Sequence, residues 1–327
     1  MSSSPLRVVF AIPILDDWTA ALGLLQRLDT VAGERGYDAS VLFVDDGSSA
    51  AAPANEFAGP WRALREVEVL RLARNLGHQR AIAIGLTFLH QERPPRDAVV
   101  VMDGDGEDRP EDVPLLLDEL ERLGRAKVVF AERARRSEGV LFRGFYQLYR
   151  ALHLLLTGIS VRVGNFSAMP WSALGSFVVV AEAWNHYAAA VFKARLPRTL
   201  VPIARGTRIA GTSSMNFVAL AMHGLSAISV FGDVVGVRLL VASSAGLATF
   251  VALFAAGLAA RSGGALVVPD WVLTWCLVSI LLCLQLVILA FVITFSILSA
   301  RNTLSFLPSR DYAYFVSGAV RVFPRSA

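Results

Sequence analysis

The stretch Val99–Glu111 reads V-V-V-M-D-G-D-G-E-D-R-P-E, an apolar run that ends abruptly in acidic residues. Residues 98–102 form an uninterrupted apolar segment rich in β-branched side chains, which predicts a strand buried on both faces of a sheet. Asp103, Asp105 and Glu107 follow its carboxyl end, where open α/β sheets bind ligands. Carboxylates at alternate positions repel one another unless a cation lies among them, and Mg²⁺ or Mn²⁺ suits such oxygen ligands. The alternative is a solvated acidic turn before the next helix.

Strands and helices alternate along the first part of the chain. The predicted strands are Arg7–Ile12, Ser40–Val44, Val67–Leu72, Ala98–Met102 and Lys127–Ala131. The predicted helices between them are Trp18–Glu34, His78–Leu89 and Glu111–Leu123. This order predicts an α/β domain with a mostly parallel sheet and right-handed crossovers. No G-x-G-x-x-G segment follows the first strand, which disfavours a dinucleotide-binding oxidoreductase, and no P-loop is present.

The apolar residues are concentrated toward the C-terminus. The whole chain is 54% hydrophobic with a mean hydropathy of +0.52, too apolar for an ordinary soluble protein. Leu239–Ala260 has 22 residues without a charge, and Trp271–Ala300 has 30. Because about 20 apolar residues span a bilayer, we expect transmembrane helices at about 239–260 and 272–297. The alternative is a buried helical hairpin of a soluble protein.

The sequence is therefore expected to divide into four parts. These are a nucleotide-binding domain (1–210), an amphipathic juxtamembrane segment (211–237), two transmembrane helices (238–300) and a cytoplasmic tail (301–327). Thr212–Gly232 carries no charge but contains several Ser, Asn and His side chains, which favours a helix lying in the membrane interface. If that segment crossed the membrane instead, the domain and the tail would lie on opposite sides.

The distribution of basic residues predicts the orientation. Met1–Arg7 has no long apolar stretch, so no cleavable signal is expected. Two spans place the domain and the tail on one side, which carries Arg238, Arg301, Arg310, Arg321 and Arg325. The loop 261–270 offers only Arg261 against Asp270. We expect a multi-pass protein of the inner (plasma) membrane with both ends in the cytoplasm.

The remaining composition narrows the partners. The net charge of +4 suits anionic lipids and phosphates, and no motif of nucleic-acid binding occurs, so no nucleic-acid partner is expected. Cys276 and Cys283 both fall inside the second span, which leaves no disulfide framework or zinc site. The five histidines lack metal-ligand spacing, and His78 at a helix start is expected to be a cap or packing residue.

Three acidic strand ends carry a family resemblance. Ile12–Asp17 (I-P-I-L-D-D), Val44–Ser48 (V-D-D-G-S) and Met102–Asp108 (M-D-G-D-G-E-D) resemble the I-P-x-Y-N-E, V-D-D-G-S and D-x-D-L-Q-D-P-P-E elements of family 2 glycosyltransferases with the GT-A fold. Leu72–Ala81 (L-A-R-N-L-G-H-Q-R-A) is similar to that family's R-N-x-G segment, and Arg208–Met215 (R-I-A-G-T-S-S-M) to its R-x-x-G-x-S-K-Y element. With the two spans, the chain most resembles the polyprenyl-phosphate branch, which includes dolichol-phosphate mannose synthases and bacterial undecaprenyl-phosphate glucosyltransferases.

The resemblance implies inverting, metal-dependent transfer of a sugar from a nucleotide-diphosphate donor to a polyprenyl phosphate at the membrane. A homo-oligomer is one assembly that it implies. The positions that match metal ligands on the donor diphosphate are Asp103, Asp105 and Glu107, of which Asp103 also serves donor binding. Those that match contacts to the base and ribose are Pro13, Asp17, Asp45 and Asp46. The basic positions that match contacts to donor and acceptor phosphates are Arg133, Arg143 and Arg208.

The chain departs from the family pattern in four places, and these leave two other functions open. Leu15–Asp17 replaces Tyr-Asn-Glu, Gly106 replaces Leu, Glu107 replaces Gln, and Ser214 stands where the family has a basic residue. Loss of that basic side chain removes one phosphate partner. The first alternative is therefore the same fold acting on a hydroxyl of a glycolipid or lipid-linked glycan, which needs a base, and Asp108 is the nearest candidate. The second is a non-catalytic membrane scaffold with a relic nucleotide fold.

Overall fold

The computed structural model describes residues 4–133, 140–159, 163–204, 206–209, 217–263, 267–300 and 306–324. The chain divides into two compact units. The first comprises Met1–Gly144, Val161–Val230 and Phe306–Ala327, and the second comprises Phe145–Ser160 and Phe231–Ser305.

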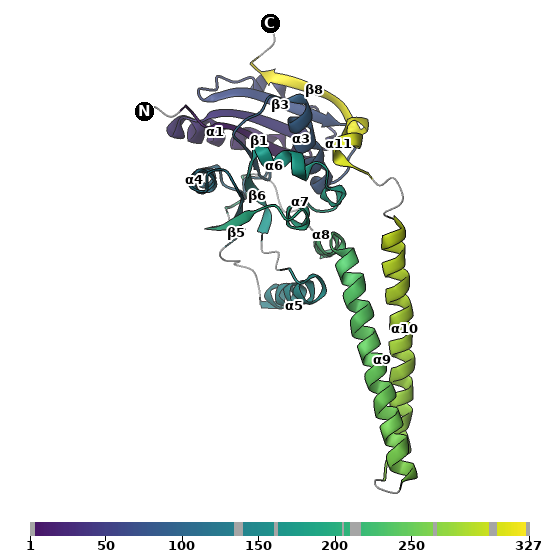
Figure 1. The fold of residues 1–327 in the computed structure, drawn as a ribbon. Helices are drawn as coiled ribbons and strands as arrows, with labels where there is room; N and C mark the ends of the chain where they lie inside the picture. Colours follow the sequence, from purple (N-terminus) through teal and green to yellow (C-terminus); the bar gives the residue numbers. More distant parts are fainter. Residues whose placement is uncertain are drawn as a thin grey trace. The chain divides into compact units, whose positions relative to one another are not determined.

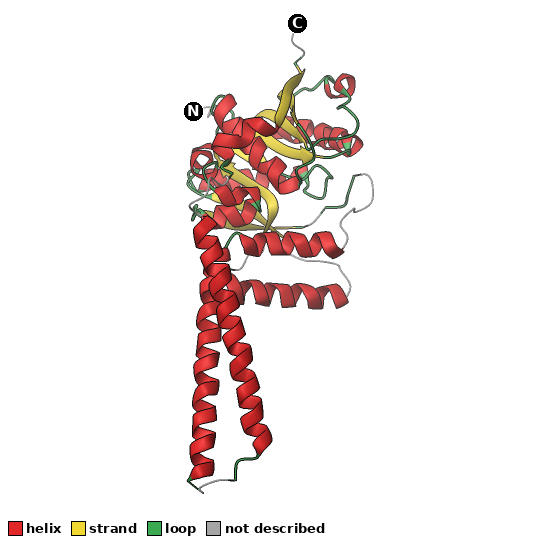
Figure 2. Ribbon diagram, turned by 90° about the vertical axis from the view of Figure 1, so that its right-hand side faces the viewer, coloured by secondary structure: helices red, strands yellow, loops and turns green. Residues whose placement is uncertain are grey.

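The first unit is built on one twisted sheet with helices on both faces (Figures 1 and 2). Within the described residues the sheet has eight strands. In sheet order they are β7 (Arg198–Ile203), β5 (Val128–Arg133), β6 (Val163–Pro170), β4 (Ala98–Val101), β1 (Arg7–Ile14), β2 (Asp38–Asp45), β3 (Leu64–Leu72) and β8 (Val316–Phe323). The helices of this unit are α1 (Trp18–Arg35), α2 (Ala54–Phe57), α3 (His78–Glu92), α4 (Val113–Arg122), α6 (Trp171–Phe177), α7 (Tyr187–Lys193), α8 (Phe217–Ser229) and α11 (Pro308–Asp311). Short 3₁₀ turns are η1 (Pro110–Asp112), η2 (Ala181–Trp184) and η3 (Tyr312–Phe315).

The central block of the sheet is parallel, as the sequence predicts. Strands β4, β1, β2 and β3 are neighbours, and Val8 pairs with both Ala98 and Ala39. All four residues of β4 are buried, which confirms a strand covered on both faces. Since these strands run in one direction, their carboxyl ends lie along the same edge of the sheet.

Two helical layers bury the alternating side chains of these strands. Val41 and Phe43 belong to the core cluster that β2 shares with α1 and α4. Val44 points to the opposite face, where a Cβ built on Gly85 of α3 would lie only 2.6 Å from its Cγ2. Phe43 is fully buried, and burying such a side chain stabilises the fold by about 1.5–3 kcal/mol.

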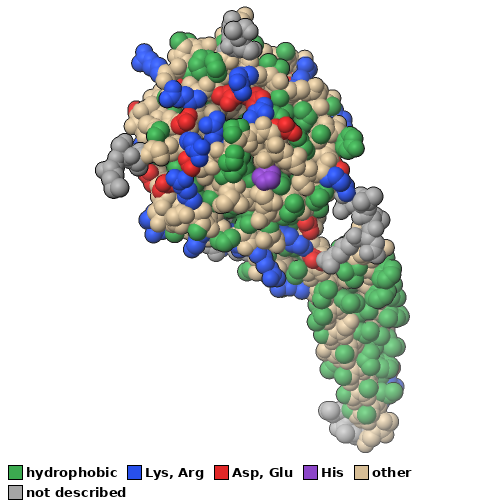
Figure 3. Space-filling view, turned by 45° about the horizontal axis from the view of Figure 1, so that its top comes forward, with side chains coloured by type: hydrophobic (Ala, Val, Ile, Leu, Met, Phe, Trp, Pro, Cys, Tyr) green, Lys and Arg blue, Asp and Glu red, His purple; other side chains and the backbone are tan. Residues whose placement is uncertain are grey.

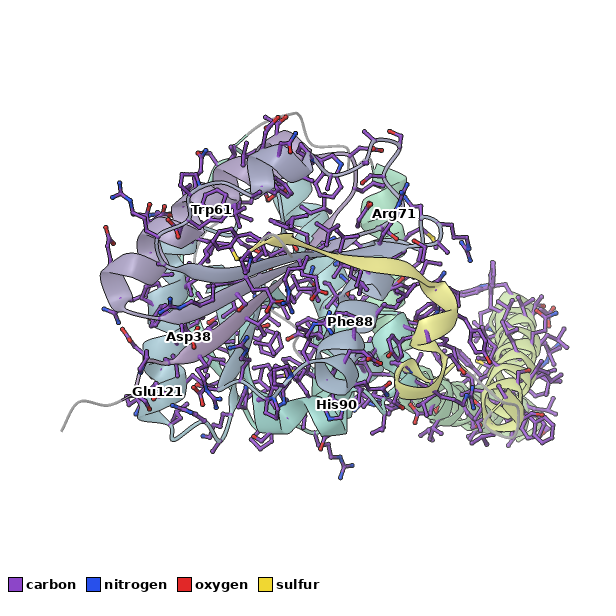
Figure 4. All side chains as sticks on the ribbon, turned by 90° about the horizontal axis from the view of Figure 1, so that it is seen from above. Asp38, Trp61, Arg71, Phe88, His90 and Glu121 are labelled. Atoms are coloured by element: carbon purple, nitrogen blue, oxygen red, sulfur yellow. The ribbon has the colours of Figure 1, made fainter. Side chains whose placement is uncertain are left out.

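The C-terminal residues add a strand to the sheet. The predicted cytoplasmic tail, residues 301–327, contains β8, which pairs antiparallel with β3, with Val320 opposite Val69. Figure 4 shows β8 along the edge of the sheet, beside Arg71 of β3. The strand alternates exposed and half-buried residues over much of its length, so its hydropathy is too weak to identify a strand. Its pairing covers an edge that would otherwise be open.

The second unit contains two long apolar helices, α9 (Gly232–Ser262) and α10 (Asp270–Ala300), together with most of α5 (Val140–Thr157). Each long helix has 31 residues, or about 46 Å of length, and is apolar enough to cross a membrane. Together they contain both predicted spans.

The two long helices pack together through small residues and expose their large ones. A Cβ built on Gly236 would lie 2.5 Å from Thr294 Oγ1, so the backbone of α9 approaches α10 closely. Leu281 and Phe295 are 60% and 62% exposed, and Figure 3 shows many hydrophobic side chains on the visible face of this hairpin. A buried hairpin of a soluble core would be covered, so these exposed side chains disfavour that alternative.

Helix α8 lies in the segment for which a crossing was the alternative. It has 13 residues, about 20 Å, which is shorter than the roughly 30 Å hydrocarbon core of a bilayer. It belongs to the first unit with β8. The chain thus leaves that unit after Val230 and returns at Phe306, with two candidate spans between.

Candidate active site

The three acidic strand ends lie together at the carboxyl edge of β4, β1 and β2. The N–H of Asp16 donates to Ser48 Oγ at 2.9 Å, which ties the end of β1 to the end of β2. The Asp16 carboxylate in turn accepts the N–H and the hydroxyl of Ser49, both at 2.7 Å. Asp16 has φ = 55°, a conformation that Asp tolerates better than most residues. The two hydrogen bonds from Ser49 lower the pKa of the Asp16 carboxyl.

Asp46 organises the next loop. Its carboxylate accepts the N–H of Leu76 at 2.7 Å and of Gly77 at 2.9 Å, which holds the R-N-x-G segment against the end of β2. Burial raises the pKa of Asp46, although these two bonds favour its charged form. Gly47 has φ = +77°, and a Cβ there would lie 2.6 Å from the backbone nitrogen of Asn75. Only glycine fits at that point.

The turn after β4, residues 103–108, is held by its own side chains; we term it the acid turn. Asp108 is 4% exposed, and its Oδ2 accepts the N–H of Asp103 at 2.9 Å. Asp105 Oδ1 accepts the N–H of Glu107 at 2.9 Å. Asp108 therefore shapes the turn from inside, a poor position for a base that must reach an acceptor hydroxyl.

Asp103 contacts two residues that the sequence did not identify as part of the site. His78 Nε2 lies 3.0 Å from Asp103 Oδ1, and Asn165 Nδ2 donates to the same oxygen at 3.3 Å. Gln79 Nε2 donates to Asn165 Oδ1 at 3.1 Å, and Gln79 Oε1 accepts the N–H of Tyr187 at 2.6 Å. His78 is the first residue of α3, after the N-cap residue Gly77, and it contacts an acid of the site instead of capping the helix. Burial lowers the pKa of its imidazole, but the charge and hydrogen bond of Asp103 outweigh burial and raise it overall.

Arg208 approaches the acid turn from the segment 206–209. Its Nη2 donates to Asp105 Oδ2 at 2.7 Å, and its Nε lies 3.7 Å from Glu107 Oε1. Burial is the main cause that raises the pKa of Asp105. The neighbouring carboxylates raise that pKa further, and Arg208 opposes them.

The acid turn offers the right atoms for a hard divalent cation, but they are engaged by protein partners. Asp103 pairs with His78, and Asp105 with Arg208. Among the described residues no three His, Cys, Asp or Glu side chains are arranged to hold a metal ion. By donor type the acids fit Mg²⁺ or Mn²⁺. Binding would require them to release at least one present partner.

The other predicted site residues are placed as follows. Pro13 is buried in β1 opposite Val44, and Asp17 directly precedes α1. Asp45, the last residue of β2, is buried, and its Oδ2 lies 3.8 Å from Arg71 Nε.

The remaining basic candidates are only partly described. Arg133 is the last residue of β5 and Arg143 lies in α5, but the side chains of both fall outside the described residues. Ser214 falls outside them as well.

This fold and edge have counterparts among known proteins. The sequence profile described as "Glycosyl transferase family 2" matches residues 12–176, which include all three acidic strand ends and half of the chain. The chain belongs to glycosyl transferase family 2. A curated relative of this family 2 chain, described as the uncharacterized glycosyltransferase YkcC of Bacillus subtilis (strain 168), is 26% identical over 234 residues, covering 67% of each chain.

The first unit has the α/β GT-A fold, and solved structures of other proteins are similar to this family 2 glycosyltransferase. One is glucosyl-3-phosphoglycerate synthase from Mycobacterium tuberculosis in complex with Mn²⁺, UDP-glucose and phosphoglyceric acid. It aligns with a TM-score of 0.50 and 14% identity, covering 71% of this chain and 80% of that one. Another is mannosyl-3-phosphoglycerate synthase from Rubrobacter xylanophilus, with a TM-score of 0.48 and 14% identity over 69% of this chain and 72% of that one.

Proposed function

We propose that this glycosyltransferase transfers a sugar, with inversion, from a nucleotide-diphosphate donor to a polyprenyl phosphate at the cytoplasmic face of the inner membrane. One observation carries the proposal. Two helices able to cross a membrane lie between Val230 and Phe306, two points of the same catalytic unit. A transferase tied to a bilayer at both points is suited to an acceptor whose reactive group lies at the lipid surface.

The orientation follows from the same arrangement. Because β8 pairs with β3, the strands on both sides of the hairpin belong to one side of the membrane. An even number of crossings satisfies this. Arg238 lies in the first two turns of α9 and Arg310 follows α10, both near the domain end of the hairpin, and the positive-inside rule then favours the cytoplasm.

The donor would bind along the carboxyl edge of β4, β1 and β2. In this proposal Asp17, Asp45 and Asp46, which lie at the ends of β1 and β2, contact the base and ribose, and the acid turn after β4 faces the diphosphate. Asp103, Asp105 and Glu107 would hold Mg²⁺ or Mn²⁺ there. The bound ion would supply charge neutralisation of the departing nucleoside diphosphate.

A phosphate acceptor suits the ionisable side chains at this edge of the sheet. In the reaction an acceptor phosphate oxygen bonds to the anomeric carbon on the face opposite the leaving group, and the carbon–oxygen bond to the nucleoside diphosphate breaks. A phosphate monoester has its second pKa near about 6, so it is already an anion at neutral pH and needs positioning more than deprotonation. Arg133, Arg143 and Arg208 are the proposed positioning cations. The buried position of Asp108, the nearest candidate base, supports a phosphate acceptor over a hydroxyl acceptor.

Nucleotide release from a donor panel tests the proposal. The full chain in detergent is incubated with Mn²⁺ or Mg²⁺, undecaprenyl phosphate and a series of nucleotide sugars. We expect release that requires the lipid phosphate and the metal and that falls about a hundredfold in Asp105→Ala. Asp118→Ala, an exposed acid on α4 paired with Arg35, is the matched control and should behave as wild type.

Two acceptor controls separate the rival functions. Transfer to phosphoglyceric acid, which is bound in the solved structure of glucosyl-3-phosphoglycerate synthase, in place of the lipid would contradict the proposed acceptor. Transfer only to a glycolipid hydroxyl would favour the first alternative. Absence of nucleotide-sugar binding across the panel would favour a scaffold.

A further inference from the structure

The guanidinium of Arg208 occupies the side of Asp105 that a metal ion would need. Arg208 Nη2 is 2.7 Å from Asp105 Oδ2, while Asp105 Oδ1 already accepts the N–H of Glu107. A divalent ion such as Mg²⁺ binds a carboxylate oxygen at about 2.0–2.1 Å. Two cations at one oxygen repel strongly in a partly buried site, and the Asp105 side chain is only 15% exposed. The guanidinium and the ion therefore compete for Asp105.

The same competition extends to Glu107. Arg208 Nε lies 3.7 Å from Glu107 Oε1, so one guanidinium bridges two of the three acids. The arginine supplies the positive charge that the repelling carboxylates require.

The backbone of the arginine segment is attached to the acid turn independently of the side chain. Gly206 N–H donates to the Glu107 carbonyl at 2.9 Å, and Ile209 N–H donates to the Asp105 carbonyl at 3.0 Å. Ile209 also packs on Gly106, where a Cβ would lie 2.4 Å from its Cγ1. The long Arg208 side chain can therefore leave Asp105 while its Cα stays beside the turn.

We propose that Arg208 is the resident counter-ion of the acid turn and is exchanged for the divalent ion when the donor binds. The displaced guanidinium then contacts the donor diphosphate, which offers it bidentate phosphate oxygens a short distance away. This inference rests on the proposed metal-dependent transfer. The proposed exchange gives Arg208 a second role: its guanidinium excludes the metal ion from the acid turn until the donor diphosphate binds.

Metal binding without nucleotide tests the exchange. Mn²⁺ is titrated into the full chain in detergent, and the free ion is followed by electron paramagnetic resonance. We expect Arg208→Gln to bind Mn²⁺ about three- to tenfold more tightly than wild type, because no internal cation has to be displaced. Arg208→Lys keeps a competing charge and should stay near wild type.

Arg109→Gln is the matched control. Arg109 Nε lies 3.7 Å from both Glu111 and Asp112, just beyond the acid turn, so this variant removes the same charge without freeing Asp105. Its Mn²⁺ affinity should change less than twofold. With UDP or GDP added, wild type should gain more affinity than Arg208→Gln, because only wild type has a guanidinium to transfer to the phosphates.

The following results of the Mn²⁺ titration would contradict the proposed exchange of Arg208 for the metal ion. Equal affinities of wild type and Arg208→Gln, or an equal gain in Arg109→Gln, would show that Arg208 does not compete for the ion. In either case metal-dependent turnover of wild type would leave the proposed function standing. No Mn²⁺ binding to any of these proteins, even with nucleotide, would instead refute the metal part of the proposed function and the exchange with it.

Discussion

His78 Nε2 and Asn165 Nδ2 converge on the same oxygen, Oδ1 of Asp103, at 3.0 and 3.3 Å. The two side chains come from the start of α3 and from β6, so three separate segments meet at this carboxylate. Two contacts at one oxygen fix the rotation of the carboxylate about its last bond. Asp103 is thereby oriented before any donor arrives, which is how a site limits the cost of ordering on binding.

This relationship predicts that His78→Ala lowers kcat/KM for the donor about tenfold, because an unsupported Asp103 loses its fixed orientation. His90→Ala is the control, since His90 is an exposed residue of the same helix. Steady-state nucleotide release measures both variants. An equal loss in the two would mean that α3 is merely destabilised, and no loss in either would mean that the His78 contact does not serve the reaction.

A second prediction concerns the loop that Asp46 holds. Gly47→Ala should destabilise the protein by more than Gly36→Ala, although both glycines have positive φ, +77° and +65°. At Gly36 nothing lies within 4 Å of the added Cβ, so only backbone strain of about 1–2 kcal/mol applies. At Gly47 the Cβ would clash with the backbone of Asn75, which adds about 1–3 kcal/mol.

Thermal unfolding of the two glycine variants in the same detergent provides the comparison, with nucleotide-sugar binding as the second readout. Only Gly47→Ala should weaken donor binding, because only Gly47 borders the R-N-x-G segment. Equal unfolding midpoints would show that the loop yields to the methyl group without cost.

The strand ends could be predicted from sequence because their chemistry is local. An apolar β-branched run followed at once by acids marks the edge of a buried strand, and Asp46 and Asp103 were placed correctly on that basis. The parallel order of β4, β1 and β2 then brings these ends together. The two long apolar helices could also be predicted from sequence, because a segment that can span a bilayer needs about 20 consecutive apolar residues.

The contacts across the fold could not be predicted in this way. Asn165 and His78 are 87 positions apart and carry no shared spacing signal, so only the antiparallel pairing of β6 with β4 brings Asn165 to Asp103. The sequence V-G-N-F-S-A-M-P is a weak strand signal because polar residues interrupt it. The bond from the Asp103 amide to the Asp108 carboxylate has no sequence signal either, because a turn acid carries no mark of the backbone group that it accepts.

A third prediction concerns how the stability of the fold changes at low pH. It depends on Asp97, just before β4. Its carboxylate accepts the N–H of Arg7 at 2.8 Å and pairs with Arg125 at 2.6 Å. Burial alone would raise the pKa of Asp97, but these partners outweigh burial and lower it below the usual range. A depressed pKa means stability that is present at neutral pH and lost as the pH falls through the folded-state pKa.

Asp97→Asn should therefore lower the free energy of unfolding at pH 7. The loss should be only about 1 kcal/mol, because both arginines are partly exposed. The difference between variant and wild type should shrink as the pH falls below about 4. Unfolding midpoints of wild type and variant between pH 3 and pH 7 measure it. Curves that stay parallel over this range would show that the charge of Asp97 contributes nothing.

The last prediction concerns the number of membrane crossings. Ser262 ends α9 beside the loop between the two long helices, and Ser317 lies in β8, where its hydroxyl donates to the Arg71 carbonyl. With two crossings, these positions must lie on opposite sides of the membrane.

Ser262→Cys should react with a membrane-impermeant thiol reagent only from the periplasmic or extracellular side, and Ser317→Cys only from the cytoplasmic side. The natural thiols Cys276 and Cys283 lie inside α10 and should be shielded by lipid in both preparations. Sealed vesicles of the two orientations make the comparison direct. Labelling of both new cysteines from one side would mean that the hairpin does not cross, and the membrane-face acceptor would lose its main support.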